Sequence, residues 1–226
     1  MVVQNSLTLS RNDEVITEIC SLNWTNLTAQ EMISVAWAYY FFSVQFRENL
    51  CIACELFSDD PALKRLFAEE CDTANLSPYP GIAEPGEKMN HDEFMRRSLE
   101  CHRLPEETER SFKAAGARYM HSVKSIPRMV RALSMASYED GGLERLFKAM
   151  LTAPHYDNAL LNAFRFFLSE HIRFDSDPVA GHGSLSRHLE ADDSVAELWQ
   201  LFRELLIETT PKLLDKAGEE HVHALI

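Results

Sequence analysis

The sequence predicts an all-α protein, and three observations lead to this fold class. Glycine and proline, which interrupt helices, number only 8 and 9 in 226 residues. The commonest residues favour helix formation, and no segment shows the sustained period-two alternation of a β-strand. The chain is also long enough to bury a sizeable core. We expect a single domain over residues 1–226, a bundle of seven to eight helices with its core from about residue 28 to 215.

The first expected helix begins at a capping box, Thr28-Ala-Gln-Glu31, and runs from about Met32 to Phe57. It is apolar nearly all round, which indicates a central helix that packs on several sides. Its uncharged run, residues 32–46, is shorter than the roughly 20 residues that span a bilayer. The aromatic residues in this helix are Trp37, Tyr39, Tyr40, Phe41, Phe42 and Phe46.

A shorter helix is expected over residues 60–71, because Pro61 suits a first helical turn. Residues 73–90 hold three prolines and two glycines and therefore predict a loop. Long ordered loops tend to be lids or binding elements, and we expect this inserted loop to act as a lid. Helix resumes at Asn90 or His91.

The remaining segments continue the helical pattern without internal repeats, low-complexity stretches or a domain boundary. Apolar residues recur at helical spacing in each of them. The expected helices run from Pro105 to about Ser125, from Pro127 to Glu139, from Leu143 to Leu151, from Asn158 to Asp175, and from about Ser194 to Leu214.

Charge and cysteine usage exclude several classes of function. The formal net charge of −13 argues against nucleic acid and against anionic membranes as partners. The N-terminal residues lack a basic and apolar leader, and the five cysteines are irregularly spaced, so we expect free thiols and a cytoplasmic protein. Cys51-x-x-Cys54 has no second pair, so buried thiols are favoured over a zinc or redox site.

Residues 170–182 are the most informative stretch for function. His171 and Asp175 are four apart at the end of an apolar helical run, so both project from one face. Pro178 then breaks the helix, and His182 follows soon after. An exposed i,i+4 pair is the alternative interpretation of this spacing.

Other polar residues lie where a plain bundle has no use for charge. Taken one by one, Glu139 reads as a fraying helix end, His91 as a solvated helix start, and Glu69 and Glu70 as a solvated face. Taken together with residues 170–182, they supply three carboxylates and three imidazoles. Two adjacent iron or manganese ions need this mixture of oxygen and nitrogen ligands. A single-zinc hydrolytic site is less apt, because the sequence has no His-Glu-x-x-His.

The order Glu, His, Ser-Tyr-Glu, then His-x-x-x-Asp and a further His resembles the heme-oxygenase-like di-metal oxidases, over roughly residues 30–215. The resemblance implies a seven-helix fold, two Fe(II) ions (or manganese) and O2 as co-substrate. It implies the metal ligands Glu70, His91, Glu139, His171, Asp175 and His182.

The chain departs from the family pattern at two places. The loop 73–90 lengthens the usual gap between the first glutamate and histidine, so Glu69, Glu84 or Glu87 competes with Glu70 as first ligand. The last histidine, His182, follows its aspartate by seven residues instead of three.

The resemblance further implies an O2-activating oxidase or oxygenase that acts on a small substrate, an amino acid or amine in our preferred reading, by N-oxygenation or oxidative bond cleavage. A fatty-acid decarboxylase or desaturase of the same family, a cofactorless enzyme similar to thiaminase II or the pyrroloquinoline quinone synthase, and a non-enzymatic interaction protein are the alternatives. The di-iron oxidase that the resemblance implies is compatible with an external electron donor and with a homodimer. We expect a pocket walled by residues 37–46 and gated by residues 73–90, with Arg165 and Arg173 as candidate partners of a substrate carboxylate.

Overall fold

The all-α prediction is confirmed by the structure, a computed structural model that describes residues 10–175 and 182–215, with the side chains of residues 174 and 175 excepted. Within these residues there is no β-strand, and two isolated bridges, Thr73 with Met89 and Tyr79 with Ala83, pair parts of the predicted loop. The buried apolar side chains of the described helices form one core.

Nine helices of eight or more residues occur in the described part of the chain, one more than the largest number expected. They are α1 (Arg11–Cys20), α2 (Ala29–Leu56), α3 (Pro61–Cys71), α4 (His91–Glu100), α5 (Glu106–Ser125), α6 (Arg128–Ser137), α7 (Leu143–Met150), α8 (Ala159–Asp175) and α10 (Ala196–Thr209). A one-turn helix, α9 (Gly183–Ser186), lies between the last two.

Helix α1 was not predicted from the sequence. Its N-cap is Ser10, whose side chain accepts a hydrogen bond from the backbone N–H of Asp13. Val15, Ile16 and Ile19 are buried on one face of it. The signal was therefore present in the sequence, as an N-cap residue followed by apolar residues at helical spacing.

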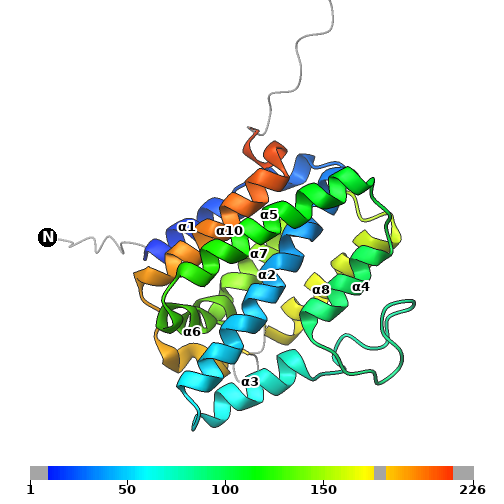
Figure 1. The fold of residues 1–226 in the computed structure, drawn as a ribbon. Helices are drawn as coiled ribbons and strands as arrows, with labels where there is room; N and C mark the ends of the chain where they lie inside the picture. Colours follow the sequence, from blue (N-terminus) through cyan, green and yellow to red (C-terminus); the bar gives the residue numbers. More distant parts are fainter. Residues whose placement is uncertain (1–9, 176–181, 216–226) are drawn as a thin grey trace, which may run out of the picture.

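Helix α2 is the central element that the aromatic run predicts. It packs against α3, α4, α5, α6, α8 and α10 (Figure 1). The predicted capping box forms: Thr28 N–H donates to Glu31 at 2.7 Å, and Glu31 N–H donates to the Thr28 hydroxyl at 3.3 Å. Helix α3 follows and crosses the end of α2, which brings its C-terminal turn beneath the bundle (Figure 1).

The chain between α6 and α7 is not a simple helix end. Residues Tyr138–Gly142 form a π-helical turn that ends in a kink, where Gly141 has a φ of 91°, a left-handed conformation that glycine adopts readily. Gly183, at the start of α9, lies so close that a Cβ there would be 2.8 Å from the backbone oxygen of Glu139. This close approach holds the start of α9 against the π-helical turn.

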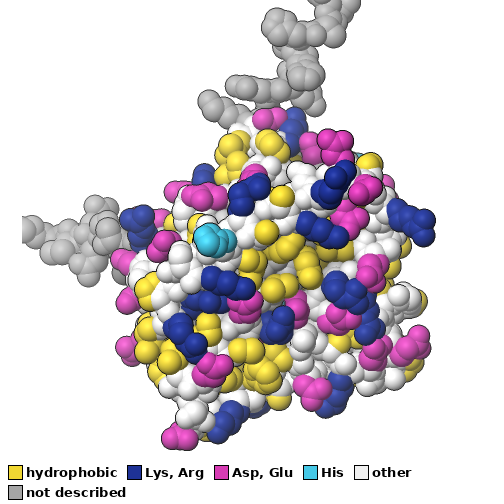
Figure 2. All heavy atoms as spheres, in the orientation of Figure 1, with side chains coloured by type: hydrophobic (Ala, Val, Ile, Leu, Met, Phe, Trp, Pro, Cys, Tyr) yellow, Lys and Arg dark blue, Asp and Glu magenta, His cyan; other side chains and the backbone are white. Residues whose placement is uncertain are grey.

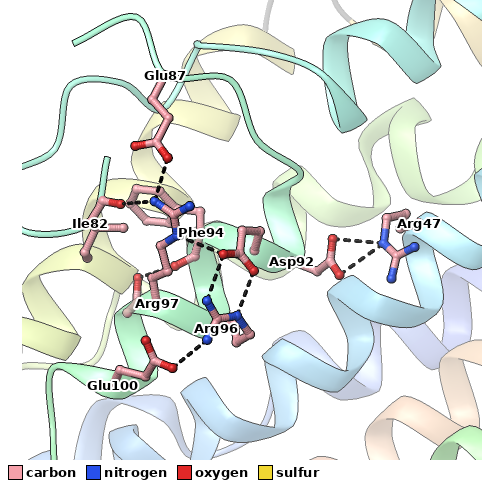
Figure 3. A network of polar contacts seen from close by, with 10 residues as sticks. Arg47, Ile82, Glu87, Asp92, Phe94, Arg96, Arg97 and Glu100 are labelled. Atoms are coloured by element: carbon pink, nitrogen blue, oxygen red, sulfur yellow. Dashed lines mark hydrogen bonds and ion pairs between the residues drawn. The ribbon is translucent and has the colours of Figure 1, made fainter. Parts of the chain in front are cut away.

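The loop 73–90 is fastened to α4. Arg97 of α4 donates hydrogen bonds to the backbone oxygen of Ile82 at 2.9 Å and to the Glu87 carboxylate at 2.8 Å (Figure 3). The carboxylate of Glu93 holds Arg97 from the other side at 2.8 Å. The predicted loop is therefore present, and its action as a lid stays a prediction.

The surface carries no large field of one sign on the face that Figure 2 shows. Lys and Arg side chains alternate there with Asp and Glu around a central apolar strip. In the part of the chain that the structure describes, no helix combines the length and the apolar character that crossing a membrane requires.

Candidate metal centre

Five of the six predicted ligands come together in the interior, on five different elements. Glu70 lies in the last turn of α3, His91 begins α4, Glu139 belongs to the π-helical turn, His171 lies in the last turn of α8, and His182 precedes α9. All five are buried. Asp175, the sixth, ends α8, but its side chain lies outside the described residues.

Glu70 lies at the middle of this cluster, and its two carboxylate oxygens face different partners. Oε2 is 2.5 Å from Nδ1 of His91, and Oε1 is 2.9 Å from Nδ1 of His182. The same nitrogen of His182 is 3.4 Å from Oε2 of Glu139. The cluster thus contains two groups of three potential ligands, Glu70 with His91 and His171, and Glu70 with Glu139 and His182.

His91 and His171 lie with ring nitrogens facing each other. Nδ1 of His171 is 2.8 Å from the backbone oxygen of Phe167 and must donate to it, which leaves Nε2 as an acceptor in the neutral ring. That acceptor and Oε2 of Glu70 both face Nδ1 of His91, at 3.0 Å and 2.5 Å. The other nitrogen of His91, Nε2, is 3.3 Å from Oδ1 of Asn75. Three potential ligand atoms therefore converge, and a proton on Nδ1 of His91 or a cation can satisfy them.

The other glutamates considered from the sequence lie outside the two groups. Oε2 of Glu69 is 3.4 Å from Nε2 of His182, the ring nitrogen that faces away from Glu70, and Glu69 also pairs with Arg65 at 2.6 Å. A carboxylate on the outer nitrogen of a ligating histidine is a common way to orient the ring. Glu84 is exposed in the loop, and Glu87 is bound to Arg97.

The protonation states of two members suit metal binding. Burial by itself raises the pKa of Glu70, but His91 and His182 outweigh it and hold that pKa well below its usual value. Burial, together with the neighbouring His91, lowers the pKa of His171 to about 3. At neutral pH the carboxylate is therefore ionised and the imidazole neutral, which are the forms that bind cations.

The donor set fits a pair of divalent ions such as iron or manganese. Oε1 of Glu70 is buried and has no hydrogen-bond partner of normal geometry among the described residues. Two carboxylates and three imidazoles offer the mixed oxygen and nitrogen ligation that these ions accept. Neither group of ligands includes a cysteine, and burial raises the pKa of the nearby Cys71, which keeps it a neutral thiol.

A small pocket, part of it open to solvent, lies beside the cluster. The expected aromatic helix supplies part of its wall. The lining includes Glu70, His91, Glu139 and His171 together with Tyr39, Ser43, Phe46, Arg47, Cys71, Asn90, Asp92, Leu143 and Phe167.

The two arginines named from the sequence are not in this pocket. Arg165 lies over the ring of Tyr156, 5.7 Å from its centroid, and Arg173 bonds Glu170 at 3.0 Å on the surface. The residue that sequence reasoning missed is Arg47, which lines the pocket from α2. Its signal was an arginine directly after the uncharged aromatic run.

Comparison of the chain with protein-family models, with curated proteins and with solved structures found no match. Any functional conclusion therefore depends on the geometry of the cluster and on the resemblance of its residues to a family pattern.

Proposed function

We propose that this protein is a non-haem di-iron enzyme that uses O2 to oxidise a small substrate, and that its bundle is of the heme-oxygenase-like type. One observation carries the proposal: the buried carboxylate of Glu70 faces a different group of ligands with each of its oxygens. A carboxylate so placed can bridge two cations, as in carboxylate-bridged di-iron bundles.

In this proposal His91 and His171 would hold one ion, Glu139 and His182 would hold the other, and Glu70 would contribute to both. Asp175 would complete the ligand set that the family resemblance implies. Manganese suits the same donors. With the ions bound, hydrogen bonds from His171 to Phe167 and from His91 to Asn75 would leave the ligating nitrogens deprotonated and aimed inward.

Two bound ferrous ions would supply the electrons that reduce O2. The chain's own contribution is a site largely shielded from water, since the ligands are buried and Tyr39, Phe46 and Phe167 wall the pocket. The charged and polar lining contributed by Arg47, Asp92 and Asn90 favours an amino acid or amine over a long fatty acid. Oxidation at nitrogen or cleavage of a neighbouring bond is the corresponding reaction.

Anaerobic titration with Fe(II) tests the proposal. We expect the wild type to bind about two ions per chain and to give a transient visible band when mixed with O2. Because Glu70 belongs to both groups, Glu70→Gln should lower the affinity for both ions, by at least about tenfold each. Glu139→Gln should lower the affinity for only one ion.

Glu107→Gln provides the matched control, since Glu107 is an exposed carboxylate in the first turn of α5. It should leave the iron count at the wild-type value. An iron count near zero in the wild type, or a Glu70→Gln variant that binds iron as the wild type does, would exclude the di-iron site. One ion in the wild type would contradict the two-ion form of the proposal.

A further inference from the structure

Arg47 is placed in the pocket by a carboxylate on a neighbouring helix. Its Nε donates to both carboxylate oxygens of Asp92, each at 3.0 Å (Figure 3). The Arg47 side chain is 36% exposed, and the Asp92 side chain is 12% exposed. Asp92 directly follows His91, so the pair lies immediately beside the candidate metal centre.

The terminal nitrogens of Arg47 are left available by this arrangement. Figure 3 draws dashed lines from Asp92 to Nε alone, and neither terminal nitrogen makes a hydrogen bond within the described residues. The neighbouring arginines differ. Arg96 uses its terminal nitrogens on Glu93 and Glu100, and Arg97 uses one on Ile82 and Glu87.

The surroundings of Arg47 match what an anionic group needs. It is the one Lys or Arg among the described residues that line the pocket, which it shares with His91 and His171. The two terminal N–H groups of a guanidinium form a planar fork that fits the two oxygens of a carboxylate. The apolar walls nearby, such as Phe46 and Phe167, suit the rest of a small organic acid.

We infer that Arg47 is a specificity-determining residue that binds the carboxylate of the substrate through its two terminal nitrogens. Asp92 is a positioning residue, because it holds the guanidinium through Nε and so directs the free fork. The inference rests on the proposed function in taking this pocket as the substrate pocket, whereas binding of the acid itself needs no metal.

Matched small molecules can test this on the metal-free protein. The probes are 3-phenylpropionate, its amide 3-phenylpropionamide and the amine 3-phenylpropylamine, with binding followed by ligand-detected NMR. The acid should bind about tenfold or more tightly than the amide and the amine, because only the acid pairs with a guanidinium. Arg47→Gln should abolish this preference, and Arg47→Lys, which keeps the charge and the partner Asp92, should retain part of it.

Arg96→Gln is the matched control, since it removes an arginine that lies outside this pocket, and it should bind the acid as the wild type does. Equal binding of acid and amide by the wild type, no binding of either, or an unchanged acid preference in Arg47→Gln would overturn the inference. An iron titration of the same preparations separates the two proposals. Two ions without an acid preference contradict only the role of Arg47, while an acid preference without iron contradicts only the di-iron site.

Discussion

Two groups of buried polar side chains meet at the π-helical turn, and they differ in how their hydrogen-bond donors and acceptors are paired. Tyr138 and Glu139 are consecutive residues, yet Tyr138 belongs to a hydrogen-bonded network with α2 and α5, and Glu139 belongs to the candidate metal centre. We call the first group the amide network; it consists of Gln45, Asn49, Tyr119, Arg131, Ser134 and Tyr138.

In the amide network donors face acceptors, and none of its buried side-chain nitrogens and oxygens lacks a hydrogen-bond partner. Gln45 donates to the Tyr138 hydroxyl at 2.9 Å and accepts from the Tyr119 hydroxyl at 2.6 Å. Asn49 accepts from Nε of Arg131 at 2.8 Å, and the charge of Arg131 is paired with Glu48 at 3.0 Å. A fully satisfied buried network stabilises and specifies a fold.

The candidate metal centre lacks this match. Two acceptors, Nε2 of His171 and Oε2 of Glu70, converge on the same nitrogen of His91 at 3.0 Å and 2.5 Å, and the other oxygen of the buried Glu70 carboxylate lacks a normal hydrogen bond. Such an arrangement costs stability unless something positively charged is added. Unmatched acceptors, more than burial or polarity alone, therefore distinguish the candidate centre from the amide network.

The largest difference between the two groups should appear in the unfolding of the metal-free protein. Asn49→Leu removes the acceptor of the buried Arg131 Nε, so we expect a loss of about 2–4 kcal/mol in the free energy of unfolding. His171→Leu removes one of the two acceptors that converge on Nδ1 of His91 and leaves Glu70 as its partner, so its cost should stay within about 1 kcal/mol. Urea denaturation measures both, and comparable losses would mean that the two groups do not differ as described.

A smaller effect should appear as pH dependence. The pKa of His171 is about 3 in the folded protein and near 6.5 in the unfolded chain, so the unfolded chain binds more protons between these values. The stability that the neutral His171 imidazole contributes is therefore fully present above pH 6.5, and it is lost as the pH falls toward 3. Glu70, whose pKa is also depressed, adds to the loss only below its unfolded pKa of about 4.5.

Urea denaturation of the metal-free wild type between pH 7 and pH 5 measures this dependence. Its free energy of unfolding should fall with a slope that approaches about 1.4 kcal/mol per pH unit below pH 6.5. His171→Leu should have the shallower slope. Parallel curves for the two proteins would show that His171 does not titrate differently on unfolding.

The smallest effect separates the two adjacent residues of the π-helical turn. Tyr138→Phe removes one hydroxyl from the amide network and should cost about 1 kcal/mol, with the iron count unchanged. Glu139→Gln should do the reverse and lower iron affinity with little change in the unfolding of the metal-free protein. Denaturation curves and iron titration of both variants provide the measurements, and loss of iron from Tyr138→Phe would contradict the separation.

Local pattern was enough to predict the all-α class and most helix positions. The capping box, the proline at the start of α3 and the loop 73–90 depend on neighbouring residues, and all three occur as expected. The π-helical turn was not predicted, because it depends on the close approach of Gly183, which is remote in sequence.

The site was harder to predict where it depends on packing. The sequence could not decide whether Glu70 or one of Glu69, Glu84 and Glu87 is the first ligand. The position of α3 under the bundle decides it, because it buries Glu70. Arg47 was missed because its partner Asp92 lies on another helix. Helical spacing alone also could not show that Arg165 faces away from the pocket.

The candidate ligands are spread over distant parts of the chain, which affects how stable the protein is. They come from α3, α4, α8, the π-helical turn and the residue before α9. In the proposed centre each ion takes its three ligands from three different segments, so only the folded chain would bind it. Each ion at a hundred times its dissociation constant would then add about 2.7 kcal/mol to the free energy of unfolding. In the proposed di-iron protein the metals would act as cross-links between distant segments, and resistance to proteolysis would rise and fall with the supply of iron.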